Sequence, residues 1–271
     1  MMTGGGRGRR GGATLARHGA CLVTLLLASA MALTLAPVAR GQDVEWTRQF
    51  GTGGSDGADG VSVDGSGVYV SGATGGTLPG QTYSGGDRDA FVRKYDAGGS
   101  EAWTRQFGSA GNDAGVVVTA DASGVYVSGY AAGALPGQTS SGGYDVFVRK
   151  YTSAGTEVWT RQFGSGSDDF PAGISVYASG VYVVGKTLGT LPGQTASGSG
   201  DVFVRKYDSA GTEAWTRQFG TSADDSGNGI AVDASGVYVA GWVPSALPGQ
   251  TYLGGVSDIF VRKYDASGTE Q

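Results

Sequence analysis

The sequence has 271 residues, of which 52 are glycine and only 7 are proline, and its formal net charge is −5. Glycine does not recur at every third position, so the composition excludes a collagen-like triple helix. The single cysteine and the single histidine, Cys21 and His18, lie before residue 42, which excludes disulfides, a thiolate nucleophile, a histidine base and a His/Cys zinc site from the rest of the chain.

Residues 1–41 have the pattern of a secretory signal peptide. Four arginines between positions 7 and 17 precede an apolar run from Cys21 to Ala36, and small residues at Ala39 and Gly41 form a candidate cleavage site. The apolar run is shorter than the roughly 20 residues of a membrane-spanning helix. We therefore expect a protein that is secreted, periplasmic or on the cell surface, with no transmembrane span after cleavage. A retained membrane anchor is the alternative.

The chain that follows this segment is strongly acidic. It keeps all 24 Asp and Glu residues but only 14 of the 19 Lys and Arg residues, which gives a formal charge of −10. Such a charge disfavours binding to nucleic acids and to anionic membrane surfaces. We therefore expect a protein, peptide or glycan ligand and no nucleic acid. No pattern in the sequence indicates an oligomeric state.

Residues 42–271 contain four repeats of 56 or 57 residues. Four motifs recur in this range: WTRQFG, first at 46–51; GVYV, first at 67–70; LPGQT, first at 78–82; and FVRKY, first at 91–95. A fixed period of this length is the signature of a repeat architecture. The sequence therefore predicts one domain that is built from four similar units.

Each unit is predicted to form four β-strands. The first is short, and the others coincide with the GVYV, FVRKY and WTRQF motifs; the first strands are expected at 61–63, 116–119, 174–176 and 230–232. Alternating Val, Tyr, Phe and Trp between Gly/Asp/Ser turns are typical of strands, and no segment between them has a helical period. Four-stranded antiparallel blades repeated about an axis describe an all-β β-propeller.

The positions of the WTRQFG motifs predict how the propeller closes. The first copy, Trp46–Gly51, precedes the first unit, whereas the last unit reaches Gln271 without a copy of its own. We expect residues 44–51 to complete the fourth blade together with 229–264, because closure by the N-terminal strand would remove two open sheet edges. A fragment of a larger ring is the alternative.

The repeat resembles the SBBP-type β-propeller repeat of bacterial proteins. The resemblance rests on GTSADDSGNGIAVDASGVYVAG at 220–241 and SDIFVRKYDASGTE at 257–270, and similar units recur four times over 44–271. The resemblance implies a propeller in a secreted or surface-associated protein. It implies no enzymatic activity, so it transfers no catalytic residues to this chain.

An Asp follows each WTRQFG motif at a fixed distance, in a loop that leads into a first strand. We expect these loops on one loop-rich face, around the mouth of a central channel. Three interpretations are open: the carboxylates cap their own loops, bind calcium through several oxygen ligands, or act in pairs in glycoside hydrolysis. The candidate residues are Asp56, Asp113, Asp168, Asp169, Asp224 and Asp225.

A second set of positions differs among the four units. The residue that follows GVYVxG changes from copy to copy, and an aromatic residue interrupts the third acidic loop. Exposed aromatic side chains in a repeated frame would suit binding to a sugar ring or a peptide. The alternative is that they pack the loops onto the sheets. The candidate ligand-binding residues are Tyr130, Lys186, Trp242 and Phe170.

Together these features predict a secreted, non-enzymatic β-propeller that acts as a binding or scaffold module at the cell surface or in the periplasm. No cofactor is expected, with calcium as the one candidate. Two alternatives remain. The first is a carboxylate-dependent enzyme acting on glycans with Asp168 and Asp169 or Asp224 and Asp225. The second is a surface structural protein that calcium rigidifies.

Overall fold

The described part of the chain is built from β-strands. The computed structural model describes residues 44–178 and 180–271, which form fifteen strands and no helix. Within these ranges there is accordingly no helix that is long and apolar enough to cross a membrane. The predicted all-β fold is confirmed. The predicted signal peptide, residues 1–41, lies outside the described residues.

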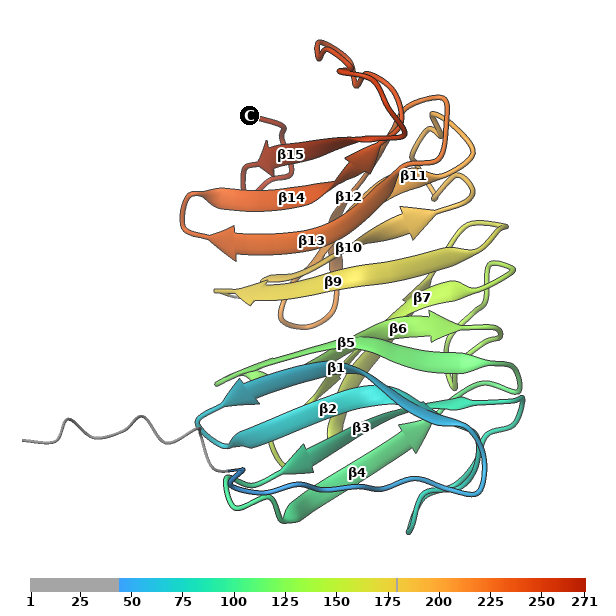
Figure 1. Cartoon of the computed structure of the whole chain (residues 1–271), viewed down its shortest axis with the longest axis vertical. Helices are drawn as coiled ribbons and strands as arrows, with labels where there is room; N and C mark the ends of the chain where they lie inside the picture. The colour runs from blue at the N-terminus through green and yellow to red at the C-terminus, as the bar shows by residue number, and fades with distance from the viewer. Residues whose placement is uncertain (1–43, 179) are drawn as a thin grey trace, which may run out of the picture. The chain divides into compact units, whose positions relative to one another are not determined.

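The strands form four sheets, which we number in chain order (Figure 1). Sheet 1 contains β1 (Asp56–Asp64), β2 (Gly67–Thr74), β3 (Asp89–Tyr95) and β4 (Glu101–Phe107). Sheet 2 contains β5 (Asp113–Asp121), β6 (Gly124–Ala131), β7 (Asp145–Tyr151) and β8 (Glu157–Phe163). Sheet 3 contains β9 (Asp169–Tyr177), β10 (Gly180–Thr187), β11 (Asp201–Tyr207) and β12 (Glu213–Phe219). Sheet 4 contains β13 (Ser226–Asp233), β14 (Gly236–Val243) and β15 (Asp258–Tyr264).

Each sheet is an antiparallel meander in which strands that follow one another in the chain are neighbours. In sheet 1, Val61 of β1 lies opposite Val70 of β2. Sheets 1 to 3 are the four-stranded units predicted from the repeats, and sheet 4 has three strands. The first strand is longer than predicted, because β1 begins at Asp56 and continues through a β-bulge at 58–60. Gly and Ala have low strand propensity, so pairing with β2, and not local sequence, makes this part a strand.

An Asp and a Gly set the turn between the third and fourth strands. In the β3–β4 turn, Asp96 N donates to Ser100 O at 2.9 Å, and Asp96 Oδ1 accepts from Ser100 N at 2.8 Å. Gly99 has φ +75°, a conformation that costs other residues energy. The same turn recurs at 208–212 and 265–269, and at 152–156 with Thr152 in place of the Asp.

A Trp and an Arg of each complete sheet fasten it to the sheet that follows. Trp103 Nε1 of β4 donates to Ser153 O at 3.0 Å, and Arg105 Nε donates to Gly155 O at 2.7 Å. Both acceptors lie in the β7–β8 turn of sheet 2. The same two bonds join sheet 2 to sheet 3 and sheet 3 to sheet 4. We call this pair of bonds the Trp/Arg latch.

Consecutive sheets also enclose a hydrophobic cluster between them. Between sheets 1 and 2, Phe107 meets the edge of Phe147 at a centroid distance of 5.3 Å, and Val92 is fully buried. Arg149 stacks on Phe107, with its Cζ 3.9 Å from the ring centroid, and pairs with Glu157 at 3.4 Å. This ion pair compensates the buried guanidinium charge, which would otherwise be costly to desolvate.

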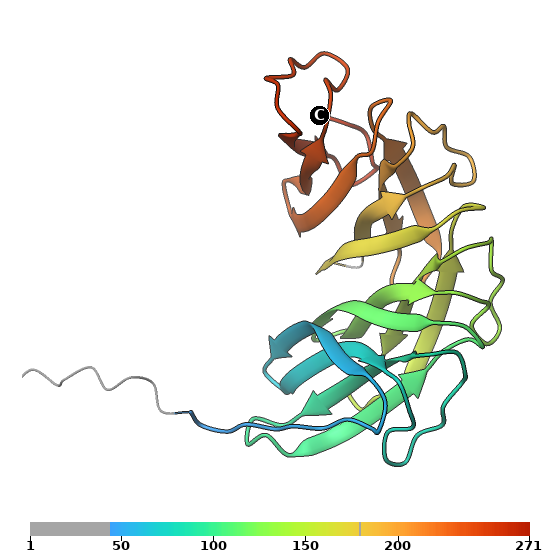
Figure 2. The ribbon, with the colours of Figure 1, turned by 45° about the vertical axis from the view of Figure 1, so that its right-hand side comes forward.

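The predicted closure by the N-terminal strand is not seen. Residues 46–51 form no strand, and sheet 4 has three strands rather than four. The segment lies against sheet 1 (Figure 2), where Trp46 Nε1 donates to Ala97 O at 3.1 Å and Arg48 Nε to Gly99 O at 2.6 Å. These bonds repeat the Trp/Arg latch, which joins the motif to the sheet that follows it. Pairing with β15 would need a separate set of bonds.

Candidate functional site

The two loops that carry the candidate residues lie together at one end of the sheets. The loop between the second and third strands meets the loop that leads into the next sheet: Asp113 N donates to Arg88 O at 2.9 Å, and Asp87 N donates to Asn112 Oδ1 at 2.7 Å. Corresponding backbone bonds recur at Asp169 and Asp225. We call this region the loop end.

The acidic residues of the loop end mostly bind their own loops. Asp113, Asp169 and Asp225 are buried, and Asp113 Oδ2 accepts from Ser109 N at 2.7 Å. Asp56 is exposed but accepts in the same way from Thr52 N at 2.6 Å. The buried carboxylates therefore lie inside the loops. Their bonds are those of the loop-capping interpretation.

The structure pairs these carboxylates with a second set that sequence reasoning missed. Asp89 is fully buried, and its Oδ2 accepts from Ser84 N at 2.7 Å and from Gln106 Nε2 at 3.0 Å, while its Oδ1 has no hydrogen-bond partner in the structure. Asp89 Oδ1 and Asp113 Oδ2 lie 2.7 Å and 2.6 Å from the point where a β-carbon on Gly108 would stand. The same pairing joins Asp145 to Asp169 and Asp201 to Asp225.

Each pair brings two carboxylates together away from water. Burial, with a further contribution from the Asp89 carboxylate, raises the pKa of Asp113 to about 6, although hydrogen bonds from Ser109 oppose this. Burial also raises the pKa of Asp169 and of Asp225. Two carboxylates supply at most four of the six to eight oxygens that calcium takes. Among the described residues, no group of three or more His, Cys, Asp or Glu side chains is placed to hold a metal ion.

The remaining acidic candidates also have partners. Asp168 Oδ1 accepts from Tyr144 N at 3.0 Å, and Asp224 Oδ1 pairs with Lys186 Nζ at 2.5 Å. Lys186 lies on β10 and Asp224 precedes β13, so the pair joins sheets 3 and 4. A candidate ligand-binding residue and a candidate metal ligand thus bind each other.

The aromatic candidates of sheets 2 and 3 form one cluster. The Tyr130 ring meets Tyr144 at 5.1 Å and Phe170 at 5.3 Å, both nearly edge-on. Tyr130 lies on β6 and Phe170 on β9, so the cluster bridges two sheets. Trp242 of β14 is half-buried and makes no ring–ring contact among the described residues. Of the candidates, Trp242 is therefore the aromatic side chain with most freedom to contact a ligand.

The Gln of each complete fourth strand ties that strand to the LPGQT loop. Gln106 Oε1 accepts from Leu78 N at 2.8 Å, and Gln106 N donates to Gln81 Oε1 at 3.0 Å. Gln106 Nε2 donates to Gly76 O at 2.9 Å and to Asp89 Oδ2 at 3.0 Å. Sheets 2 and 3 repeat all four bonds. Sequence reasoning missed this Gln, although it recurs in every copy of the motif.

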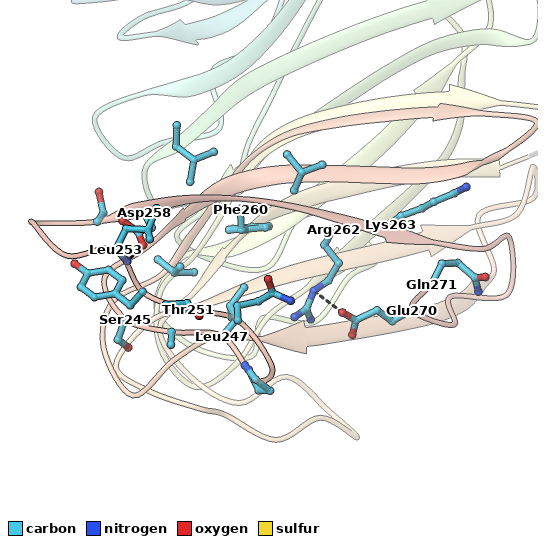
Figure 3. Close-up of a pocket in the computed structure, with 18 residues that line it drawn as sticks. Ser245, Leu247, Thr251, Leu253, Asp258, Phe260, Arg262, Lys263, Glu270 and Gln271 are labelled. Atoms are coloured by element: carbon cyan, nitrogen blue, oxygen red, sulfur yellow. Dashed lines mark hydrogen bonds and ion pairs between the residues drawn. The ribbon is translucent and has the colours of Figure 1, made fainter.

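A groove replaces the fourth strand in sheet 4 (Figure 3). It has a volume of about 640 Å³ and follows the outer edge of β15. The equivalents of the groups that bind Gln106 line it, namely Ser245, Leu247, Gln250 and Asp258. Figure 3 also shows Arg262 directed toward Glu270, with which it pairs at 3.1 Å. The groove therefore keeps the polar groups that hold a fourth strand in the other three sheets.

Four consecutive antiparallel units joined by identical contacts define this chain as a β-propeller-type repeat protein. Residues 214–242 match the family of the SBBP beta-propeller repeat, so the chain contains a repeat of that family. A stretch of 149 residues is 30% identical to the Regulatory protein FlaEY of Caulobacter vibrioides. The match covers 51% of this chain and 16% of that relative, so the chain spans only a small part of its length.

Proposed function

We propose that this chain is a non-enzymatic β-propeller module that binds or scaffolds proteins outside the cytoplasm, and that the groove along β15 receives an extended segment of the partner. One observation carries the proposal: sheet 4 keeps the groups that hold a fourth strand elsewhere, and among the described residues only the bridge between Tyr264 and Glu270 pairs along the outer edge of β15. An open sheet edge offers unpaired backbone N–H and C=O groups, which bind extended peptides by strand addition.

The polar groups that line the groove determine which peptide sequence fits it best. In sheet 3, Gln218 bonds the loop through the backbone of Leu191 and the side chain of Gln194. Leu247 and Gln250 hold the corresponding positions in the groove. A segment of the WTRQF type therefore matches it best, because its Gln meets groups that are already in place.

The state of the acidic residues supports a non-enzymatic role. Asp169 and Asp225 are fully buried, and the carboxylate of Asp224 forms an ion pair with Lys186. A glycosidase needs two accessible carboxylates at a defined separation on either side of the scissile bond. The location outside the cytoplasm is supported by the charge and apolar pattern of residues 1–41.

Peptide binding tests this proposal. A fluorescein-labelled peptide with the sequence of residues 212–221, TEAWTRQFGT, is titrated with the protein and followed by fluorescence anisotropy. We expect saturable binding, and a roughly fivefold weaker affinity for the Gln250→Ala protein or for a peptide with Ala at the Gln218 position, because a lost hydrogen bond costs about 1 kcal/mol.

The controls separate strand addition from adsorption. A peptide of the same composition in scrambled order should bind at least tenfold more weakly, and Gln138→Ala in the intact sheet 2 should leave the affinity unchanged. Equal binding of the native and scrambled peptides, or no binding of either, would contradict the proposal.

A further inference from the structure

The two asparagines of the sequence, Asn112 and Asn228, lie in different surroundings. The side chain of Asn112 accepts from Asp87 N at 2.7 Å through Oδ1, and the backbone N that follows it, of Asp113, donates to Arg88 O at 2.9 Å. Asn228 lies on β13 and is exposed. Solvent therefore reaches the Asn228 amide, whereas the groups around the Asn112 amide are held by hydrogen bonds.

Asn228 is the unpaired residue of a β-bulge. Gly227 pairs with Gly241 of β14. The next pair is Gly229 with Ala240, which leaves Asn228 without a residue opposite it. A bulge disrupts the ladder locally, and glycine on both sides removes the restrictions that a β-carbon puts on the backbone. A β-carbon on Gly229 would meet no atom within 4 Å, so the space beside this residue is open.

A hydroxyl group also activates the Asn228 side chain. Ser226 Oγ donates to Asn228 Oδ1 at 2.8 Å. Such a bond polarises the amide carbonyl and stabilises the negative charge that develops on the oxygen when a nucleophile adds to the carbon. The first strands of the other sheets have no hydroxyl group at the position of Ser226, which is held by Gly57, Ala114 and Phe170.

We infer that Asn228 is a site of spontaneous deamidation. Gly229 N gives up its proton to solvent and forms a bond to Asn228 Cγ, because the chain holds the two atoms as neighbours. The bond from Cγ to Nδ2 then breaks, and ammonia leaves with a proton returned by solvent. Water opens the resulting five-membered succinimide at either carbonyl carbon, which gives aspartate or isoaspartate at position 228. Water is the only co-reactant, and nothing is oxidised or reduced.

The fold can accept the product. In β1, the bulge lies between Ala58 and Gly60, so Asp59 already holds the position that Asn228 has in β13. Isoaspartate adds one carbon to the backbone, at a place where the strand already has an extra residue. Since an aspartate side chain is ionised at neutral pH, each event adds one negative charge to sheet 4. The modified fraction would therefore grow with the age of the protein while the sheets stay folded.

Mass spectrometry of proteolytic fragments tests the inference in the full chain. The folded protein is incubated at about pH 6 and at about pH 9, and a second sample is kept unfolded in urea. In the folded protein, Asn228 should gain the mass difference between an amide and an acid, faster at the higher pH because Gly229 N must lose a proton. Asn112 should stay unchanged. Ser226→Ala should slow the reaction roughly fivefold, by the loss of one hydrogen bond.

Further variants and outcomes keep the inference open to refutation. Gly229→Ala should nearly abolish the reaction, and it should fold because its β-carbon meets no atom. An Asn228 that stays intact in the folded protein while it converts in urea overturns the inference, and so does a product with aspartate but no isoaspartate. Asn228→Asp should melt within about 2 °C of the wild type; a larger fall would contradict a fold that accepts the product. None of these results depends on peptide binding in the groove.

Discussion

Buried carboxylate pairs are the most unusual feature of this protein at the scale of single residues. Asp89 and Asp113 lie together with little water, and the oxygen of Asp89 that faces Asp113 has no hydrogen-bond donor in the structure. A proton on Asp113 would remove the repulsion between the two like charges. The pairs should therefore couple the stability of the loop end to pH.

The direction of this coupling follows from the raised pKa of Asp113, about 6 against an ordinary 3.8. The folded protein binds this proton more tightly than the unfolded chain, so the free energy of unfolding falls as pH rises from about 4 to about 6. Asp169 and Asp225, whose pKa values are also raised, act in the same direction. We expect the wild type to melt at a higher temperature at pH 5 than at pH 7.5.

Asp89→Asn should raise the melting temperature at pH 7.5 and reduce its pH dependence. The amide removes the charge that repels the Asp113 carboxylate, while its oxygen keeps the bonds from Ser84 and Gln106. A gain on the order of 1 kcal/mol is expected, since one pKa unit corresponds to about 1.4 kcal/mol. Thermal melts at both pH values measure it, with the exposed Asp59→Asn as control. A loss of stability at pH 7.5 would contradict repulsion between the two carboxylates.

Tyr130 and Trp242 should respond differently to truncation, although they occupy equivalent positions in the repeat. Tyr130→Ala removes ring contacts with Tyr144 and Phe170 that join two sheets, and should destabilise by about 1–3 kcal/mol. Trp242→Ala removes no ring–ring contact and should change stability by less than 1 kcal/mol. Denaturant melts compare the two, with Tyr130→Phe as the conservative control. Equal losses at both positions would contradict the role given to the Tyr130 cluster.

These residues also show what the sequence could and could not predict at a site. The column of Asp residues after WTRQFG was predicted in loops, whereas the structure makes Asp56, Asp113 and Asp169 the first residues of β1, β5 and β9. Its partner Asp89 was missed, because an Asp that begins a strand looks like an ordinary turn residue until the fold brings two distant loops together. The ion pair between Lys186 and Asp224 was missed for the same reason, since the two residues belong to different sheets.

At the scale of elements, the turn between the third and fourth strands does more than reverse the chain. Its carbonyl groups accept the two hydrogen bonds of the Trp/Arg latch from the preceding sheet, and its Gly packs against the Trp ring. A β-carbon on Gly155 would stand 2.7 Å from Trp103 Cδ2. The turn therefore couples the formation of one sheet to the docking of another.

Gly155→Ala should destabilise the protein far more than Gly137→Ala. Both glycines have positive φ, +80° and +72°, so both variants bear a similar backbone strain of about 1 kcal/mol. A methyl group added at Gly137 meets no other atom within 4 Å, whereas the new methyl group at Gly155 collides with Trp103. We expect an additional loss of about 1–3 kcal/mol in denaturant melts. Equal losses would show that the latch does not constrain this turn.

The repeats made the elements predictable, and the exceptions have physical causes. Strands rich in Val, Tyr, Phe and Trp were located correctly, because period-two apolar patterns dominate there. The beginning of the first strand was missed, since its Gly and Ala residues form a strand only through pairing with β2. The position of residues 46–51 was also predicted wrongly. The WTRQF motif can form the Trp/Arg latch with the sheet that follows it and can pair with a third strand, and the sequence pattern does not show that residues 46–51 make only the latch.

At the scale of the whole molecule, the four third strands provide an internal comparison. Their sequences are DAFVRKY, DVFVRKY, DVFVRKY and DIFVRKY, so their intrinsic hydrogen-exchange rates are nearly equal. β3, β7 and β11 each pair with two strands, whereas β15 pairs with β14 and, on its outer edge among the described residues, only through the bridge between Tyr264 and Glu270. Differences in amide protection among them therefore report the surroundings and not the sequence.

In dilute solution, the amides of β15 that face the groove should exchange at least tenfold faster than their equivalents in β3, β7 and β11. Their exchange should slow when the TEAWTRQFGT peptide is added, because the peptide would then pair with the outer edge of β15. Hydrogen-exchange mass spectrometry with residue resolution measures both effects, and the Gln250→Ala variant should need more peptide for the same protection. Equal protection of all four strands in dilute wild type would mean that β15 is already covered within one chain. Fast exchange that persists at saturating peptide would contradict strand addition in the groove.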